Sequence, residues 1–352
     1  MAADGGRVLS GRELNRALLA RQLLLDRAGV PVDRAVERMG FVQAQYAPSM
    51  YVGLWSRVAG LRRHDVTRAL EERTVVQGTL LRATIHLVPA ADWWYASAAV
   101  RAARRRWWLA AHRSTPSMEA DVEAAAERAR AALAGGPRRR ADLVAELGID
   151  RATWNGVGLW LDLVRVPPSG TWERRSADLH ALAEDWIGPP PPEATEEAGL
   201  ELLLRRYLGA FGPAPLRDAA NWAGLPATAF DRAAPALGVR RFLDESGREL
   251  VDLPGAPLPD AGTVAPVRLL PTWDAILLVH ARRAGVLAEQ HRPLLFSTRT
   301  PQSSPSFLVD GRVAGRWRLD GRRVLTEAFS PLPAKARREL DAEADRMGRF
   351  VS

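Results

Sequence analysis

The sequence predicts an α+β protein: tandem winged-helix units, each a helix-turn-helix followed by a β-hairpin, and then a small C-terminal β-barrel or sheet domain. Two stretches, 136–166 and 212–243, repeat one order of Gly-Pro, helix, Gly-containing turn, helix and strand. Each leads into a run with Ser-Gly at its turn, at 167–175 and 243–253, which indicates a hairpin. From Val267 onward, strand-like runs are separated by Asp-Gly turns.

The N-terminal part carries a third version of this order. Apolar residues at helical spacing predict helices over 12–25, 32–42 and 49–59. An alternating run at 80–88 then predicts a strand. One face of that strand would carry Leu81, Ala83, Ile85 and Leu87, and the other face would carry Arg82, Thr84 and His86.

A chain of 352 residues is long enough for about two to four domains. A proline run at 189–192 is a stiff spacer, and charged and apolar residues at 334–350 predict a closing helix. The predicted domains are three winged-helix units and a β-barrel-like domain that includes the closing helix, at 1–134, 135–188, 195–258 and 266–352.

Composition excludes several classes of site. The chain has no cysteine, which rules out disulfides, thiolate metal sites, iron–sulfur clusters and a cysteine nucleophile. Its six histidines are scattered without metal-ligand spacing, so we expect neither a metal nor another cofactor. Since we find no apolar run of membrane-spanning or signal-peptide length, we expect a soluble, cytoplasmic protein. We also expect a monomer.

The formal charge of +8 comes almost entirely from arginine, since Lys335 is the single lysine. Arginine donates bidentate hydrogen bonds to phosphate, and a basic excess combined with arginine and tryptophan suggests nucleic acid as the partner. A GC-rich genome would also replace lysine by arginine, and both explanations of the arginine bias stay open.

Two glutamines, Gln43 and Gln45, stand two residues apart in the apolar stretch 41–48. Residues two apart share one face only where the chain is extended, and Pro48 disfavours helix at Ala47. We therefore expect the preceding helix to end and the chain to straighten here. A buried amide without partners costs about 1–3 kcal/mol, so both side chains need partners from the protein, water or a ligand.

Three blocks of the sequence carry a resemblance to a known family. They are "GFVQAQYAPSMYVGLWSRV", "LLRATIHLVPAADW" and "LLPTWDAILLVHARR" followed by "FLVDGRVAGRWR". In this order they resemble the signature blocks of the AlkZ-like and YcaQ-like bacterial DNA glycosylases. That resemblance covers nearly the whole chain and implies tandem winged helices with a C-terminal β-barrel. It also implies an active site at Gln43-Ala44-Gln45, in the Gln-x-Gln form of the AlkZ-like members linked to antibiotic self-resistance.

The chemistry implied by the resemblance suits two amides. Alkylation at N7 of guanine makes the base cationic and already a good leaving group, so no strong acid is required. Oriented hydrogen bonds can stabilise an oxocarbenium-like sugar and place the attacking water. An amide is too weak a base to act as a conventional general base, so Gln43 and Gln45 are expected to position water and supply dipoles. Structural glutamines bonded to a turn are the alternative.

Further residues are candidates for contact with DNA. His86, together with Arg82 and Thr84, falls in the second family block and is expected near the site, in either protonation state; a histidine bonded only to backbone is the alternative. Arg101, Arg104 and Arg105 are candidates for phosphate contact. Trp107 and Trp108 beside them are expected to be core residues, and Asp274 with Arg282 can form an internal ion pair.

Two functions from different classes follow. The first is a monofunctional DNA glycosylase that removes N7-alkylated purines from duplex DNA, with bulky guanine adducts of a natural product as a plausible substrate. The second is a non-catalytic winged-helix DNA-binding protein or regulator. The paired amides at Gln43 and Gln45 favour the enzyme, because a regulator has no use for them on its DNA side.

Overall fold

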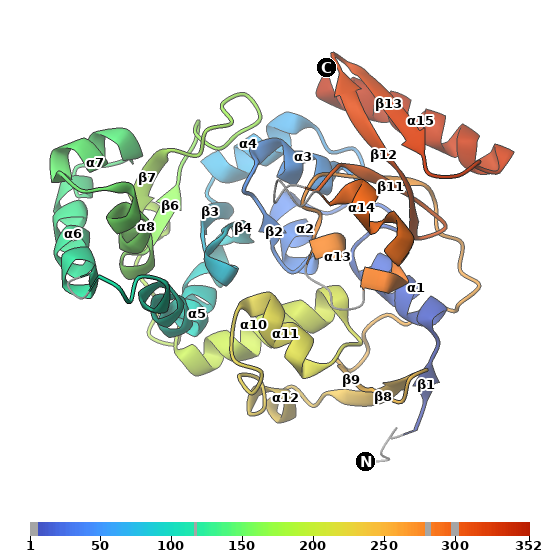
Figure 1. The fold of residues 1–352 in the computed structure, drawn as a ribbon, viewed down its shortest axis with the longest axis horizontal. Helices are drawn as coiled ribbons and strands as arrows, with labels where there is room; N and C mark the ends of the chain where they lie inside the picture. Colours follow the sequence, from blue (N-terminus) through green and yellow to red (C-terminus); the bar gives the residue numbers. More distant parts are fainter. Residues whose placement is uncertain (1–5, 116–117, 279–282, 297–302) are drawn as a thin grey trace.

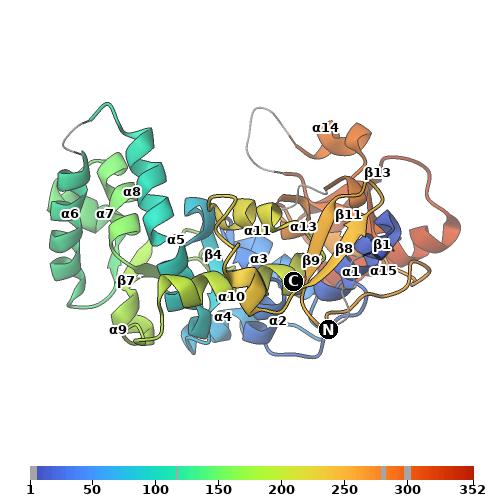
Figure 2. The ribbon, with the colours of Figure 1, turned by 90° about the horizontal axis from the view of Figure 1, so that it is seen from below.

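A computed structural model describes residues 6–115, 118–278, 283–296 and 303–352. The molecule is elongated: helices α6 (Met118–Leu133), α7 (Arg140–Leu147) and α8 (Arg151–Trp160) form one end, and the C-terminal sheet lies at the other (Figures 1 and 2). Helices are interspersed along the chain with the strands of three mostly antiparallel sheets, which confirms the α+β class.

A six-stranded antiparallel sheet lies between these ends, in the order β2-β4-β3-β6-β7-β5. Its strands are β2 (Val42–Gln43), β3 (Val75–Thr79), β4 (Ile85–Pro89), β5 (Arg138–Arg139), β6 (Leu163–Arg165) and β7 (Leu179–Leu182). The pairing of Gln77 and Gly78 on β3 with β6 joins an N-terminal half to a half from residues 138–182. As predicted, β6 and β7 form a hairpin around the loop that contains 167–175.

The N-terminal helices are shorter than their apolar patterns. They are α1 (Gly11–Arg21), α2 (Val32–Arg38), α3 (Ala47–Trp55) and α4 (Arg63–Glu71), followed by the long α5 (Ala90–Ala111). Gly40 and Phe41 adopt positive φ, 69° each, and so end the α2 region before residue 42. Pro48 was expected to disfavour helix at Ala47, yet α3 begins at Ala47, because Pro48 occupies the first turn of this helix, where no donor is needed.

The middle of the chain contains α9 (Ala183–Ile187), α10 (Glu196–Phe211), α11 (Leu216–Ala223) and α12 (Ala233–Ala236), then strands β8 (Arg240–Asp244) and β9 (Glu249–Asp252). The predicted hairpin at 243–253 is confirmed as the antiparallel β8–β9 pair. The N-terminal strand β1 (Val8–Leu9) adds to β8 in parallel register, Val8 opposite Leu243.

The C-terminal segment forms a four-stranded antiparallel sheet in the order β10-β11-β12-β13, with helix α15 (Ala334–Val351) after it. The strands are β10 (Arg268–Leu270), β11 (Ser306–Val309), β12 (Arg312–Asp320) and β13 (Arg323–Ala328), and the short helices α13 (Ala275–Leu278) and α14 (Arg292–Leu295) lie between β10 and β11. Both predicted Asp-Gly turns are present, at 310–311 and 320–321. The closing helix is confirmed.

The hydrophobic core crosses the predicted domain boundaries. One cluster of buried residues extends from Leu18 in α1 through Trp93 in α5 and Tyr207 in α10 to Val313 in β12. The first two predicted segments share one sheet, and all four contribute to this cluster. The four-domain division and the winged-helix character of its units therefore stay predictions. Within the described ranges, no helix is both long and apolar enough to span a bilayer.

Candidate functional site

Gln43 lies on β2, an edge strand of the six-stranded sheet, and Gln45 lies in the bend between β2 and α3. On β2, Gln43 stands directly opposite His86 of β4, so the two side chains share one face. The ladder continues past β2 because the Ala44 amide donates to the Ile85 carbonyl oxygen at 2.8 Å. The Ile85 amide in turn donates to Oε1 of Gln45 at 3.2 Å. The expected straightening of the chain is confirmed at Gln43, whereas Gln45 lies in the bend that leads into α3.

The two amides differ in their surroundings. Gln43 is half-buried and its side chain forms no hydrogen bond among the described residues, whereas Gln45 is exposed and accepts from Ile85. Ala44 between them is buried, as alternation along an extended chain requires. The Gln43 amide and the NH₂ group of Gln45 are therefore available to a ligand that approaches from this edge.

His86 is neutral. Its side chain is 4% exposed, and its Nδ1 lies 3.0 Å from the Thr84 carbonyl oxygen. Burial, aided by the positive charge of Arg82, lowers the pKa of His86 to about 3. Because a carbonyl oxygen only accepts, Nδ1 carries the proton and Nε2 is left as an acceptor. Of the two expected protonation states, the fold selects the neutral one.

The predicted strand does not extend over 81–84. Leu81–Ala83 form a 3₁₀ turn in which Arg82 and Ala83 have φ of 50° and 55°. The Arg82 guanidinium donates to the Trp222 carbonyl oxygen, and Thr84 Oγ1 donates to the Leu81 carbonyl oxygen at 3.1 Å. Thr84 thus closes the turn internally and Arg82 ties it to α11. The expectation that both lie on the strand with His86 is wrong, because β4 begins at Ile85.

Gly78 leaves room for an aromatic wall beside this face. It stands opposite His86 on β3, and a Cβ at Gly78 would lie 2.0 Å from the Trp93 ring. Trp93, from the first turns of α5, is almost fully buried. The indole therefore closes the sheet next to His86.

The arginines of α5 that were predicted to contact phosphate mostly bind other groups of the protein. Arg104 is 6% exposed and donates to the Thr79 carbonyl oxygen, so it cannot reach a DNA backbone in this fold, which corrects that prediction. Arg101 pairs with Asp162 at 2.8 Å, and Arg105 donates to the Leu159 carbonyl oxygen at 3.2 Å. Both are half-buried, with one face of each still accessible.

The two tryptophans of α5 behave differently. Trp108 is buried, stacks on His112 with ring centroids 4.1 Å apart, and belongs to a cluster that Ala83 packs against. Trp107 is 60% exposed, so the expectation that it is a core residue is wrong. The preceding arginine, Arg106, is exposed as well.

Sequence reasoning missed Tyr46, which follows Gln45 directly. Arg175, from the β6–β7 loop, donates to the Tyr46 hydroxyl at 3.1 Å, and its guanidinium lies 5.9 Å from the centre of the ring. The signal was present in the sequence: an aromatic residue beside the paired amides and an Arg-Arg pair in the predicted hairpin loop. The loop thus lies next to the glutamine site.

Asp274 has a partner other than the expected one. It forms a bidentate pair with Arg57, Oδ2 to Nη1 at 2.9 Å and Oδ1 to Nη2 at 2.8 Å, and both side chains are buried. This pair fastens the region after α3 to the third family block. Arg282 lies outside the described residues. Within the described ranges, no group of three or more histidine, aspartate or glutamate side chains is arranged to hold a metal ion.

Comparisons with known proteins identify the family of the chain. The family model for DNA glycosylase AlkZ-like proteins matches residues 36–350. A curated relative, the interstrand DNA cross-link repair glycosylase of Streptomyces sahachiroi, is 25% identical over 375 residues, covering 97% of this chain and 96% of its own. The solved structure of Streptomyces sahachiroi DNA glycosylase AlkZ superimposes with a TM-score of 0.81 at 21% identity, covering 98% of this chain and 97% of that one. The chain belongs to the AlkZ-like family and is a DNA glycosylase.

Proposed function

We propose that this glycosylase hydrolyses the N-glycosidic bond of N7-alkylated purines in duplex DNA, with bulky guanine adducts of a DNA-alkylating natural product among its substrates. The observation that carries the proposal is the pair of uncharged amides, Gln43 on the edge strand β2 beside the neutral His86 and Gln45 in the bend that follows. The name of the Streptomyces sahachiroi relative adds interstrand cross-links to the lesions to be tested.

The site is suited to a leaving group that needs no acid. An N7-alkylated purine carries a positive charge, and departure of the base neutralises it while the sugar becomes oxocarbenium-like. Gln43, whose side chain forms no hydrogen bond among the described residues, is assigned to orient the attacking water and stabilise the sugar. Removal of one such oriented group costs on the order of 10²-fold in rate. Gln45 acts with it, and Ile85 fixes the direction of its carbonyl oxygen.

His86 is assigned a positioning role. Because its pKa is far below neutrality, it is neither a cationic clamp for phosphate nor an efficient proton acceptor. Its Nε2 can accept a hydrogen bond on the face that also carries Gln43. It thereby orients its neighbour or a water molecule.

The reaction is proposed to be monofunctional. A bifunctional glycosylase needs an amine that attacks the sugar, and Lys335 is the single lysine of the chain. Its side chain is 74% exposed and lies 3.9 Å from Glu339 within α15. Borohydride added during turnover should trap no protein–DNA adduct, and product strands should stay whole until heated. An adduct that Lys335→Ala abolishes would contradict the water-based mechanism.

The proposal extends to the state of the protein: a monomer that acts in the cytoplasm on nucleoid DNA, built from winged-helix units at 1–134, 135–188 and 195–258 with a barrel-like domain at 266–352. The proposed winged-helix units are supported by two runs in which helices precede a hairpin, α7–α8–β6–β7 and α11–α12–β8–β9.

The decisive experiment compares three duplexes, carrying N7-methylguanine, a bulky N7-guanine adduct and an N7-linked interstrand cross-link. Purified protein should release the modified base and leave heat-labile abasic sites. The Gln43→Ala/Gln45→Ala double variant should bind the same duplexes and release little base. Equal release by the double variant would end the assignment of these residues, and no release from any of the three by the parent protein would end the proposed substrate class.

A further inference from the structure

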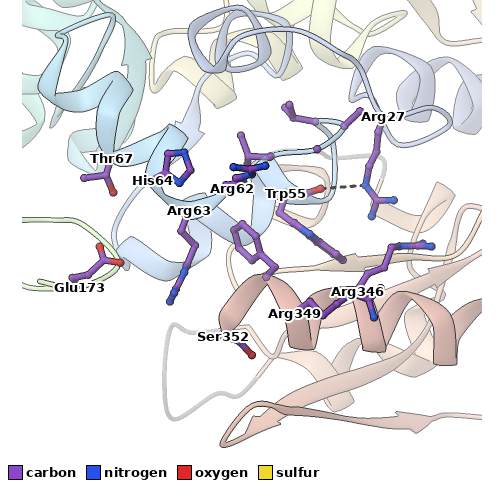
Figure 3. A pocket seen from close by; sticks show the side chains of 15 residues that line it. Arg27, Trp55, Arg62, Arg63, His64, Thr67, Glu173, Arg346, Arg349 and Ser352 are labelled. Atoms are coloured by element: carbon purple, nitrogen blue, oxygen red, sulfur yellow. Dashed lines mark hydrogen bonds between the residues drawn. The ribbon is translucent and has the colours of Figure 1, made fainter.

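We propose that the cavity between α4 and α15 is a phosphate-binding subsite, which holds the backbone of the DNA strand a few nucleotides from the lesion. The cavity has a volume of about 830 Å³ (Figure 3), and neither Gln43 nor Gln45 is among its lining residues. The guanidinium groups that line it are those of Arg27, Arg62, Arg63, Arg346 and Arg349, and His64 lies among them. Glu173 is the acidic residue of its lining.

The buried residues beneath this cavity carry more positive than negative charge. The Glu343 carboxylate is fully buried and is shared by two guanidinium groups, those of Arg27 and Arg346. A third, that of Arg268, is 7% exposed in the same cluster, and burial together with the charge of Arg27 lowers the pKa of Arg268 to about 10. The buried Glu343 and the exposed Asp26 therefore stand against three guanidinium groups, and an anion entering the cavity would relieve the remaining positive excess.

Two arginines at the rim are available to such an anion. Arg62, at the start of α4, and Arg349, in the last turn of α15, are exposed, and neither guanidinium forms an ion pair among the described residues. In Figure 3, Arg62 belongs to the upper wall and Arg349 to the helix below. The planar guanidinium can donate two parallel hydrogen bonds to one phosphate, which makes arginine well matched to this ligand.

An aromatic floor holds the cavity in shape. Trp55 and Phe350 pack with ring centroids 5.9 Å apart, and Trp172 meets Phe350 at 6.1 Å. The Arg27 guanidinium lies 4.8 Å from the centre of the Trp55 ring, and the Arg63 guanidinium lies 5.4 Å from that of Trp172. These contacts order the arginine stems before any ligand arrives and so reduce the entropy lost on binding.

The length of α3 sets the scale of the separation between Gln45 and the cavity. Helix α3 begins two residues after Gln45 and ends at Trp55 in the cavity wall. At about 1.5 Å per residue, this helix spans about 13 Å. One strand of duplex DNA presents a phosphate per roughly 3.4 Å of helix axis, so the cavity corresponds to roughly four nucleotides from the lesion.

The β6–β7 loop reaches both the glutamine site and the cavity. Arg175 contacts Tyr46 beside Gln45, while Trp172 and Glu173 lie at the cavity. The inference rests on the proposed function only in taking DNA as the ligand. It predicts that the backbone runs past this loop toward α15, because α3 itself is buried.

The test compares two double variants that remove equal charge. Arg62→Gln/Arg349→Gln alters the cavity rim and leaves the Glu343 cluster intact. Arg205→Gln/Arg232→Gln is the control, since both arginines are exposed on the α10–α12 side, far from α15 in Figure 1. Binding of a short undamaged duplex is followed by fluorescence anisotropy across a salt series, and base release is measured in single turnover at saturating protein.

The rim variant should bind the undamaged duplex on the order of tenfold more weakly at about 0.1 M salt, and the slope of log K against log salt should fall by about 1.8 because two phosphates are no longer neutralised. Its melting temperature and its base-release rate at saturation should match those of the parent. The control should keep the parent slope.

Several outcomes would overturn the inference. A rim variant with the slope and affinity of the control would show that DNA does not enter the cavity. If inorganic phosphate raised the melting temperature of the parent but not of the rim variant, while DNA affinity stayed unchanged, the ligand would be a free phosphate compound. An acidic protein segment would likewise leave DNA binding unchanged. Because undamaged DNA is the probe, failure of base release would count against the proposed function and not against this subsite.

Discussion

Gln45→Ala separates a catalytic glutamine from a structural one. The substitution removes one hydrogen bond within the protein, from the Ile85 amide to Gln45 Oε1 at 3.2 Å, at an exposed position. Water can take the place of that acceptor, so the free energy of unfolding should fall by only about 0.5 kcal/mol, at the lower limit for such bonds. For a chain of this length the melting temperature should drop by about 1 °C.

The effect on base release should be several times larger. If Gln45 stabilises the transition state, the single-turnover rate should fall on the order of 10²-fold, which is about 2.7 kcal/mol of activation free energy. The assay is release of N7-methylguanine from a duplex with protein in excess, scored as heat-labile sites, alongside chemical denaturation of the same samples. Gln45→Glu keeps an acceptor for Ile85, so it tests whether the NH₂ donor matters separately.

Gln77 supplies the matched control. It is also a strand glutamine, but it is 1% exposed and its Nε2 donates to the Gly170 carbonyl oxygen at 2.7 Å. Gln77→Ala should therefore lower stability by about 1–3 kcal/mol and leave the rate of the folded protein unchanged. If Gln45→Ala instead lost stability as Gln77→Ala does and kept its rate, the catalytic assignment of Gln45 would be refuted.

Three further predictions concern the scaffold. Asp274→Ala leaves Arg57 buried and uncompensated and should cost about 3–5 kcal/mol of unfolding free energy in a denaturant titration; a loss below about 1 kcal/mol would contradict the buried pair. Gly78→Ala forces Trp93 to move and should lower stability by about 1–3 kcal/mol, read as a lower melting temperature, whereas an unchanged melting temperature would mean that the indole does not fill this space. Burial lowers the pKa of His86 to about 3, below its ordinary value of 6.5, so the unfolded chain binds the proton more readily and stability should fall as the pH drops from about 7 to about 5, by about 2 kcal/mol from this residue. His86→Asn should flatten that pH profile, and an equally steep profile in the variant would argue against a buried neutral imidazole.

Local chemistry made some elements predictable. The Asp-Gly pairs at 310–311 and 320–321 fix tight turns by themselves, since these residues tolerate positive φ. The extended chain at Gln43 was expected because the apolar helical pattern before it ends and Pro48 follows. Both predictions rest on interactions within a few residues, which a single sequence contains.

Other elements depended on distant partners. The alternation at 81–87 resembles a strand, yet Arg82 turns back because the Trp222 carbonyl oxygen, far along the chain, accepts its guanidinium. The arginine run in α5 looks uniform, but only the fold shows that Arg104 is buried beneath Thr79 while Arg106 stays exposed. The number of arginines in α5 can be read from the sequence. Which of them are buried and which are exposed depends on tertiary packing.

The parallel pairing of β1 with β8 has a consequence for synthesis of the chain. Leu9 is opposite Asp244, so roughly 235 residues must leave the ribosome after the first strand before its partner exists. At about 5–20 residues per second, the strand waits on the order of ten to fifty seconds. During that time its backbone donors and acceptors are open to any other strand edge. A circular permutant that begins within the proline run at 189–192 would place β8 before β1 in order of emergence, and should shorten the period in which nascent chains aggregate.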